Sequence, residues 1–124
     1  MKKLFILLTL VTTPFTSIAQ TQAEMNMDAL ETLKSYKRTE QLVLNGALSR
    51  ATPTQQKKLQ RMQELWEEYT RIYSSLYIEG HTGSARPMCA SYVQEALTNQ
   101  NAQNLKSLIT REEGDVCTPV WMLN

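Results

Sequence analysis

Apolar side chains return every three or four residues along most of this chain, and this spacing restricts the fold more than any other feature. The pattern starts at Met25 and resumes after each interruption until Ile109. A helix of 3.6 residues per turn gathers such positions on one face, whereas a half-buried strand needs an alternation of period two. The sequence therefore predicts an all-α protein whose helices each bury one apolar face.

The boundary between the first two predicted helices lies at Thr52. Its hydroxyl can cap a helix, Pro53 suits the first helical position, and Gln55 stands where a capping box places Gln or Glu. One amphipathic helix is therefore expected over residues 22–50 and a second over residues 53–79. We expect these two helices to form an antiparallel hairpin.

The second predicted helix carries an aromatic seam, which we expect to form the core of the hairpin. Its apolar residues alternate in steps of three and four, as in helices that pack along their length at a shallow angle. They are Leu59, Met62, Trp66, Tyr69, Tyr73 and Leu76. Tyr69, Tyr73 and Tyr77 supply more aromatic surface than one hairpin covers, so a homodimer is a further hypothesis.

The rest of the chain is divided by glycine, proline and asparagine. Gly80 and Gly83 predict a loop, and Pro87 starts another helix. The polar segment 99–104 forms helices poorly and caps them well, so we predict a break there. The predicted fold is a bundle of three to four helices, the last two at residues 87–98 and 102–113.

The first nineteen residues have the composition of a secretory signal peptide. Lys2 and Lys3 form a basic start, residues 4–11 are apolar, and residues 17–19 form a cleavage site. About eight apolar residues are too few to span a bilayer, which takes roughly 20. We expect cleavage after Ala19, a periplasmic location and one helical domain over residues 20–124.

Cys89 and Cys117 are the two cysteines of the chain. The exported compartment is oxidising, so a disulfide within the chain is the expectation. Its Cα atoms must approach to about 5 to 6 Å. A break in segment 99–104 allows this approach, whereas one straight helix does not. A bridge between two chains remains the alternative.

The composition argues against several classes of function. The chain has 13 Lys and Arg, and loss of Lys2 and Lys3 leaves 11 against 12 Asp and Glu, a net charge of −1. This balance offers no electrostatic footprint for nucleic acid or an anionic membrane. His81 is the single histidine, and the sequence has no nucleophile motif, phosphate-binding loop or metal-ligand pair. We predict a binding protein without catalytic residues, cofactor or metal.

A series of short motifs runs from about Thr21 to Ile109. They are Thr21-Gln22-Ala23-Glu24-Met25-Asn26, Tyr36, Leu44-Asn45, Leu59, Gln63, Trp66, Tyr69, Gly83-Ser84, Pro87-Met88, Leu97-Thr98 and Leu105. In this order and spacing the chain resembles the LprI-type lysozyme inhibitor family of small exported helical proteins. The family places cysteines near Asp28 and Ser74 instead, so the covalent scaffold departs from its pattern. The resemblance implies a periplasmic protein that binds and blocks lysozyme-type muramidases.

The loop of residues 79–86 is the predicted binding site for such an enzyme. A muramidase cleft holds two carboxyl groups beside the scissile bond, so a blocking protein needs a projecting loop with hydrogen-bond donors and a cation. The candidate residues are Glu79, Gly80, His81, Thr82, Gly83, Ser84 and Arg86. Arg86 is the expected charge partner of an enzyme carboxylate. An ordinary connection between helices explains the same residues, and both interpretations stay open.

Two settings suit a muramidase inhibitor of this kind. One is immunity against a cell-wall toxin delivered by a secretion system such as type VI, and the other is defence against lysozyme. A periplasmic assembly factor or pilotin-like helical chaperone is the alternative function. The sequence argues against this alternative in one respect, because no cysteine near the cleavage site could carry the acyl anchor that such factors often have.

Overall fold

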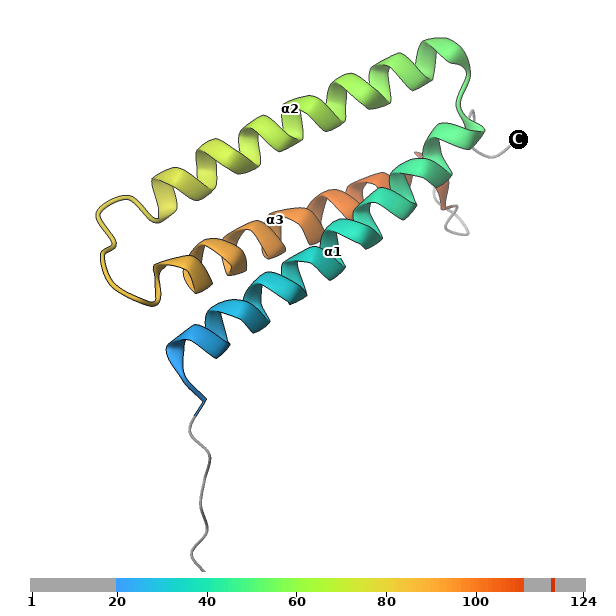
Figure 1. The fold of residues 1–124 in the computed structure, drawn as a ribbon. Helices are drawn as coiled ribbons and strands as arrows, with labels where there is room; N and C mark the ends of the chain where they lie inside the picture. The colour runs from blue at the N-terminus through green and yellow to red at the C-terminus, as the bar shows by residue number, and fades with distance from the viewer. Residues whose placement is uncertain (1–19, 111–116, 118–124) are drawn as a thin grey trace, which may run out of the picture.

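Three long helices make up the computed structural model, which describes residues 20–110 and residue 117. They are α1 (Gln22–Arg50), α2 (Pro53–Tyr77) and α3 (Arg86–Ile109). In Figure 1, α1 and α3 lie side by side and run in the same direction. The helix that connects them in the sequence, α2, runs in the opposite direction. The part of the chain that the structure describes contains no strand, so the all-α prediction is confirmed.

Capping boxes start the first two helices. At α2 the backbone N–H of Gln55 donates to Thr52 Oγ1 (3.3 Å), and the N–H of Thr52 donates to Gln55 Oε1 (2.8 Å). Thr21 and Glu24 form the same arrangement at α1. Each box satisfies two backbone donors that a helix start would otherwise leave unpaired. The predicted boundary at Thr52 is therefore confirmed.

The closest packing in the bundle joins α1 to α3 rather than α1 to α2. Both helices bury small residues, which permit a close approach of two backbones: Ala29 and Ala47 on α1, and Ser91 and Ala102 on α3. Leu44, Ala47 and the fully buried Leu105 form the core cluster, and α2 adds Leu59 to it. The hairpin of α1 and α2 is thus present in the topology, whereas the tight packing lies between the two parallel helices.

A buried polar layer joins all three helices near their middle. Gln63 of α2 donates from Nε2 to Glu40 Oε1 of α1 (2.9 Å) and accepts at Oε1 from Asn101 Nδ2 of α3 (2.8 Å). Gln63 is 8% exposed and Asn101 2% exposed. Buried amides are costly unless they are paired, so this layer sets how α2 is turned against the other two helices.

The predicted break in segment 99–104 is wrong, because α3 is continuous from Arg86 to Ile109. Asn101 does not cap a helix start there. Its side-chain Nδ2 donates to Gln63 Oε1 of α2, and Gln100 Nε2 donates to Asn104 Oδ1 (3.1 Å) along the helix surface. Tertiary pairing and local side-chain bonds outweigh the weak helix propensity of the segment. Of the predicted helix 102–113, residues up to 109 belong to α3 and residues 111–113 lie outside the described residues.

The predicted disulfide is also absent, since no bridge joins Cys89 to Cys117. Cys89 lies in the first turn of α3, and the unbroken helix carries the chain about 30 Å from it by Ile109, at 1.5 Å per residue. The prediction depended on the helix break, and it failed with it.

The aromatic seam predicted for the core lies mostly at the surface. Leu59 is buried and Trp66 half-buried, but Met62, Tyr69, Tyr73 and Leu76 are 38–63% exposed. The buried face of α2 is instead mainly polar, and its members are Leu59, Gln63, Trp66, Thr70 and Ser74. The prediction is therefore right at two positions and wrong at four, because the hydrogen bonds of Gln63 turn α2 toward its polar side.

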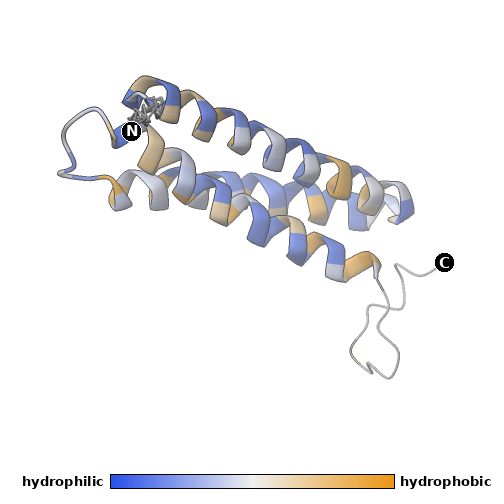
Figure 2. Ribbon diagram, turned by 90° about the horizontal axis from the view of Figure 1, so that it is seen from below, coloured by the Kyte–Doolittle hydropathy of each residue, from blue (hydrophilic) through white to orange (hydrophobic). Residues whose placement is uncertain are grey.

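Hydrophobic and hydrophilic residues are interspersed along each of the three helices (Figure 2). None of the helices in the described residues is long and apolar enough to cross a membrane. The predicted signal peptide, residues 1–19, lies outside the described part of the chain.

Candidate functional site

The loop between α2 and α3, residues 78–85, lies at the same end of the bundle as the start of α1 (Figure 1). Gly80 has φ +77° and Gly83 has φ +108°. A Cβ atom built at either position would meet nothing within 4 Å. The two glycines are therefore needed for their backbone conformation, which side-chain-bearing residues rarely adopt, and not for space.

Hydrogen bonds hold the loop in shape and attach it to α1. The N–H of His81 donates to the carbonyl of Ile78 (3.1 Å), and the N–H of Arg86 donates to that of Gly83 (3.4 Å). From α1, Asn26 Nδ2 donates to the carbonyl oxygen of Ser84 (2.8 Å). Asn26 was not among the residues predicted for the site, although it belongs to the motif on which the family resemblance rests. The loop is thus positioned by a residue 58 positions away.

The side chains of the predicted site all face solvent. Glu79, His81, Thr82, Ser84 and Arg86 are exposed, and within the described residues none of them has a side-chain hydrogen bond or ion pair. The ion pairs of the described residues lie elsewhere, on α1 between Lys34 and Glu31 and on α2 between Arg61 and Glu64. The guanidinium of Arg86 and the ring of His81 are therefore free to bind an external group.

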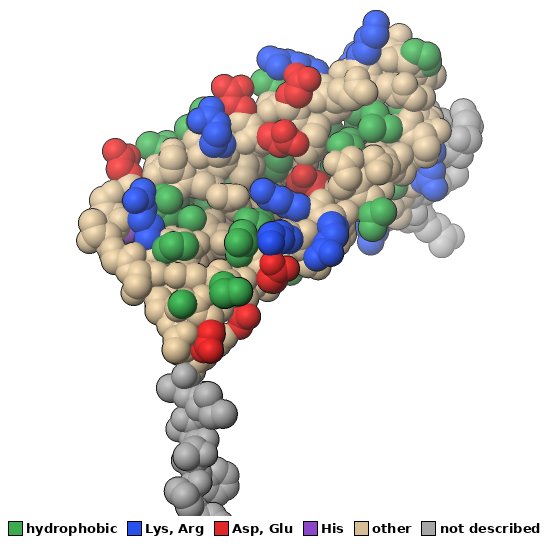
Figure 3. All heavy atoms as spheres, viewed as in Figure 1, with side chains coloured by type: hydrophobic (Ala, Val, Ile, Leu, Met, Phe, Trp, Pro, Cys, Tyr) green, Lys and Arg blue, Asp and Glu red, His purple; other side chains and the backbone are tan. Residues whose placement is uncertain are grey.

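A polar hollow of about 360 Å³ lies between α1, α2 and α3. Lys37, Glu40 and Glu67 are among its lining residues, and acidic and basic side chains are intermingled over this face (Figure 3). Among residues 20–110, Trp66 Nε1 and Thr70 Oγ1 are buried beside it, and neither has a hydrogen-bond partner there. A hollow of this size has room for water that pairs with both atoms. No group of three or more metal-ligating side chains occurs in the described residues.

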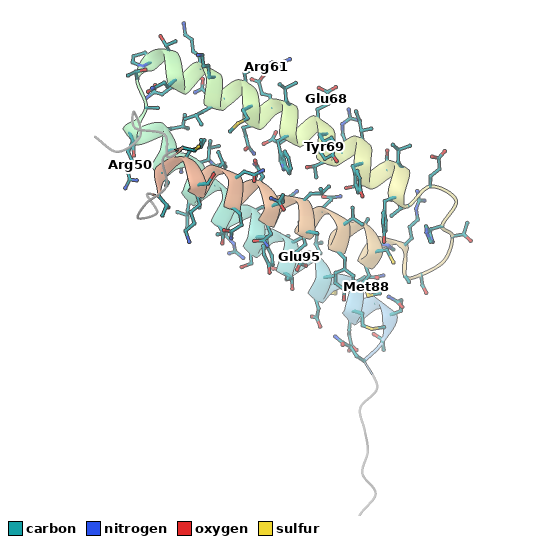
Figure 4. All side chains as sticks on the ribbon, turned by 180° about the vertical axis from the view of Figure 1, so that it is seen from behind. Arg50, Arg61, Glu68, Tyr69, Met88 and Glu95 are labelled. Atoms are coloured by element: carbon teal, nitrogen blue, oxygen red, sulfur yellow. The ribbon has the colours of Figure 1, made fainter. Side chains whose placement is uncertain are left out.

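An apolar groove of about 360 Å³ runs between α2 and α3 on the opposite side. Tyr73 and Tyr77 line it from α2, and Cys89, Tyr92 and Val93 line it from α3. In the view from behind, Tyr69 lies on the edge of α2 nearest α3, whereas Arg61 and Glu68 lie on the outer edge (Figure 4). This surface was not predicted from the sequence, because Tyr69 and Tyr73 were expected in the core. The polar spacing of Gln63, Thr70 and Ser74 was the available signal.

No family model, curated protein or solved structure matches this chain. The fold and the two surfaces define its class: a small three-helix protein with a projecting polar loop at one end and an exposed apolar flank.

Proposed function

We propose that this protein is an exported inhibitor that binds a lysozyme-type muramidase and blocks its cleft with the loop of residues 79–86. The observation that carries the proposal is the combination of two exposed, unpaired donors, His81 and Arg86, with a loop whose base is held by Asn26. The family resemblance supports the same function.

The chemistry of the loop suits an acidic cleft. A muramidase cleaves with a carboxyl pair, and a guanidinium forms short, charge-assisted and often bidentate hydrogen bonds to such groups. Gly80 and Gly83 carry no side chain, so the loop backbone can approach the cleft closely. Because Asn26 already orders the loop, binding costs less conformational entropy than it would for a free segment.

Immunity to a cell-wall toxin and defence against lysozyme both use this binding mode, and the genes beside this one discriminate between them. An adjacent gene for a muramidase toxin supports immunity, whereas its absence supports defence.

The proposal is tested by following the turbidity of a peptidoglycan suspension during cleavage by several muramidases, with and without the purified protein. We expect inhibition of at least one of them. Replacing His81 and Arg86 together by Ala removes the charge-assisted bonds, each worth about 1.5–3 kcal/mol, and should weaken inhibition by at least tenfold.

The matched control is Lys57→Ala with Gln60→Ala, which also removes one cation and one neutral polar group from exposed positions, but on α2 away from the loop. The control should inhibit like the unaltered protein. Equal inhibition by the His81/Arg86 variant, with its helical circular dichroism retained, refutes the assignment of the loop. Absence of inhibition by the unaltered protein refutes the function.

A further inference from the structure

In the described part of the chain, most of the exposed large hydrophobic side chains belong to α2, and five of them form a stripe along one flank of this helix. Its members are Met62, Leu65, Tyr69, Ile72 and Leu76, and each of them exposes 38–63% of its surface. At about 100° per residue, the centre of this stripe lies roughly a third of a turn from the centre of the buried face of α2. We call these five residues the α2 stripe.

The α2 stripe has the spacing of a coiled-coil seam. Its residues follow one another in steps of three, four, three and four over four turns, which is the heptad arrangement of helices that pack side by side along their length. Within the described residues no other helix covers it, since α1 and α3 contact the buried face instead. A partner that presents a long helix with the same repeat therefore matches the stripe better than a partner with an irregular surface.

The exposed area is close to what a stable interface needs. The groove tyrosines Tyr73, Tyr77 and Tyr92 continue the stripe toward α3, each 42–57% exposed. With about half of each side chain accessible, the stripe and these tyrosines present roughly 700 Å², compared with about 800 Å² per partner in a standard interface. Such an area exceeds the largest apolar patch of most monomers, about 300–600 Å².

We propose that a second copy of this chain covers the α2 stripe and the adjoining groove tyrosines, with α2 of each copy packed along α2 of the other about a two-fold axis. A two-fold axis presents the same patch on both copies, and the stripe supplies the heptad spacing that each side requires. The outer border of the stripe carries a cation, Arg61, and an anion, Glu68 (Figure 4). Two antiparallel copies of α2 therefore do not bring borders of uniformly like charge together. The loop of residues 79–86 lies beyond the stripe, at the end of α2.

Sedimentation equilibrium tests the dimer, using protein purified from cells that express the full chain. A reductant is included so that Cys89 and Cys117 cannot link two chains covalently. We expect a mass twice that of the chain at micromolar concentration. Ile72→Glu places a carboxylate in the middle of the stripe on both copies and should weaken association by at least a hundredfold. Gln60→Glu adds the same charge to an exposed position outside the stripe and should leave the dimer intact.

Three results would overturn the proposal. The first is a monomer at every concentration, and the second is an Ile72→Glu dimer as stable as that of the unaltered protein. The third is a protein that dimerises only after removal of residues 111–124, which would assign the stripe to the chain's own C-terminal segment. If Ile72→Glu loses its helical circular dichroism, Leu65→Glu gives the same test one heptad step away. The dimer and the inhibition are measured separately, so either can fail alone.

Discussion

Replacing Gln63 by Leu should destabilise the bundle through the amide that it leaves unpaired. Asn101 Nδ2 donates to Gln63 Oε1 at 2.8 Å, and Asn101 is 2% exposed, so water cannot replace the lost acceptor without a rearrangement. An orphaned buried polar group costs about 1–3 kcal/mol. Glu40 also loses a donor, but it is half-buried and can turn toward solvent. We therefore expect a loss of about 2 kcal/mol in the free energy of unfolding.

The double variant Gln63→Leu/Asn101→Leu tests this reasoning. Asn101→Leu alone should also cost about 1–3 kcal/mol, because it leaves the carbonyl of Gln63 without its donor. Removing both partners leaves neither group orphaned, so the double variant should lie within about 1 kcal/mol of the unaltered protein, a strongly non-additive result. Urea unfolding followed by circular dichroism measures all four proteins. Additive losses, or a Gln63→Leu protein as stable as the original, would refute the buried polar layer.

Two further substitutions test the core and the helix boundary in the same assay. Leu105→Ala, at the largest fully buried side chain of the described residues, should cost about 2–5 kcal/mol, whereas Leu42→Ala, at a 72% exposed position, should cost less than about 0.5 kcal/mol. A loss below 1 kcal/mol for Leu105→Ala contradicts the described core. Thr52→Ala removes the hydroxyl that accepts from the N–H of Gln55 and should cost about 1 kcal/mol. Thr54→Ala on the same helix is its control, and equal effects of the two would argue against the cap.

Local signals in the sequence predicted the helices well. Thr52, Pro53 and Gln55 act within one turn of each other, so their capping role is readable without knowledge of the fold. The loop at Gly80 and Gly83 is equally local, since its backbone conformation depends on the glycines themselves.

The errors arose where a distant residue decides the structure. Segment 99–104 looks like a break until Asn101 is paired with Gln63, which is 38 positions away. The same bond turns α2 so that its polar side is buried and Tyr69 and Tyr73 face outward. A spacing of three and four identifies a helical stripe, but it does not say whether the stripe packs within the chain or against another molecule.

For the candidate site, the contiguous loop residues were found from the sequence, whereas the residue that holds them was not. Asn26 reaches the carbonyl of Ser84 only because the start of α1 lies beside the loop. This proximity depends on the arrangement of all three helices and cannot be read from the residues near Asn26 or Ser84.

The central claim is that the loop occupies a muramidase cleft, and an affinity measurement across the interface tests it most directly. Calorimetry would measure the dissociation constants of the protein and of its Arg86→Ala variant for a muramidase that the protein inhibits. The same two measurements would be repeated with that enzyme after one catalytic carboxyl is replaced by an amide. If Arg86 pairs with that carboxyl, each single change should weaken binding by at least tenfold, and the second change should add little to the first. No binding to any muramidase, or fully additive losses with every catalytic carboxyl tested, would contradict the account.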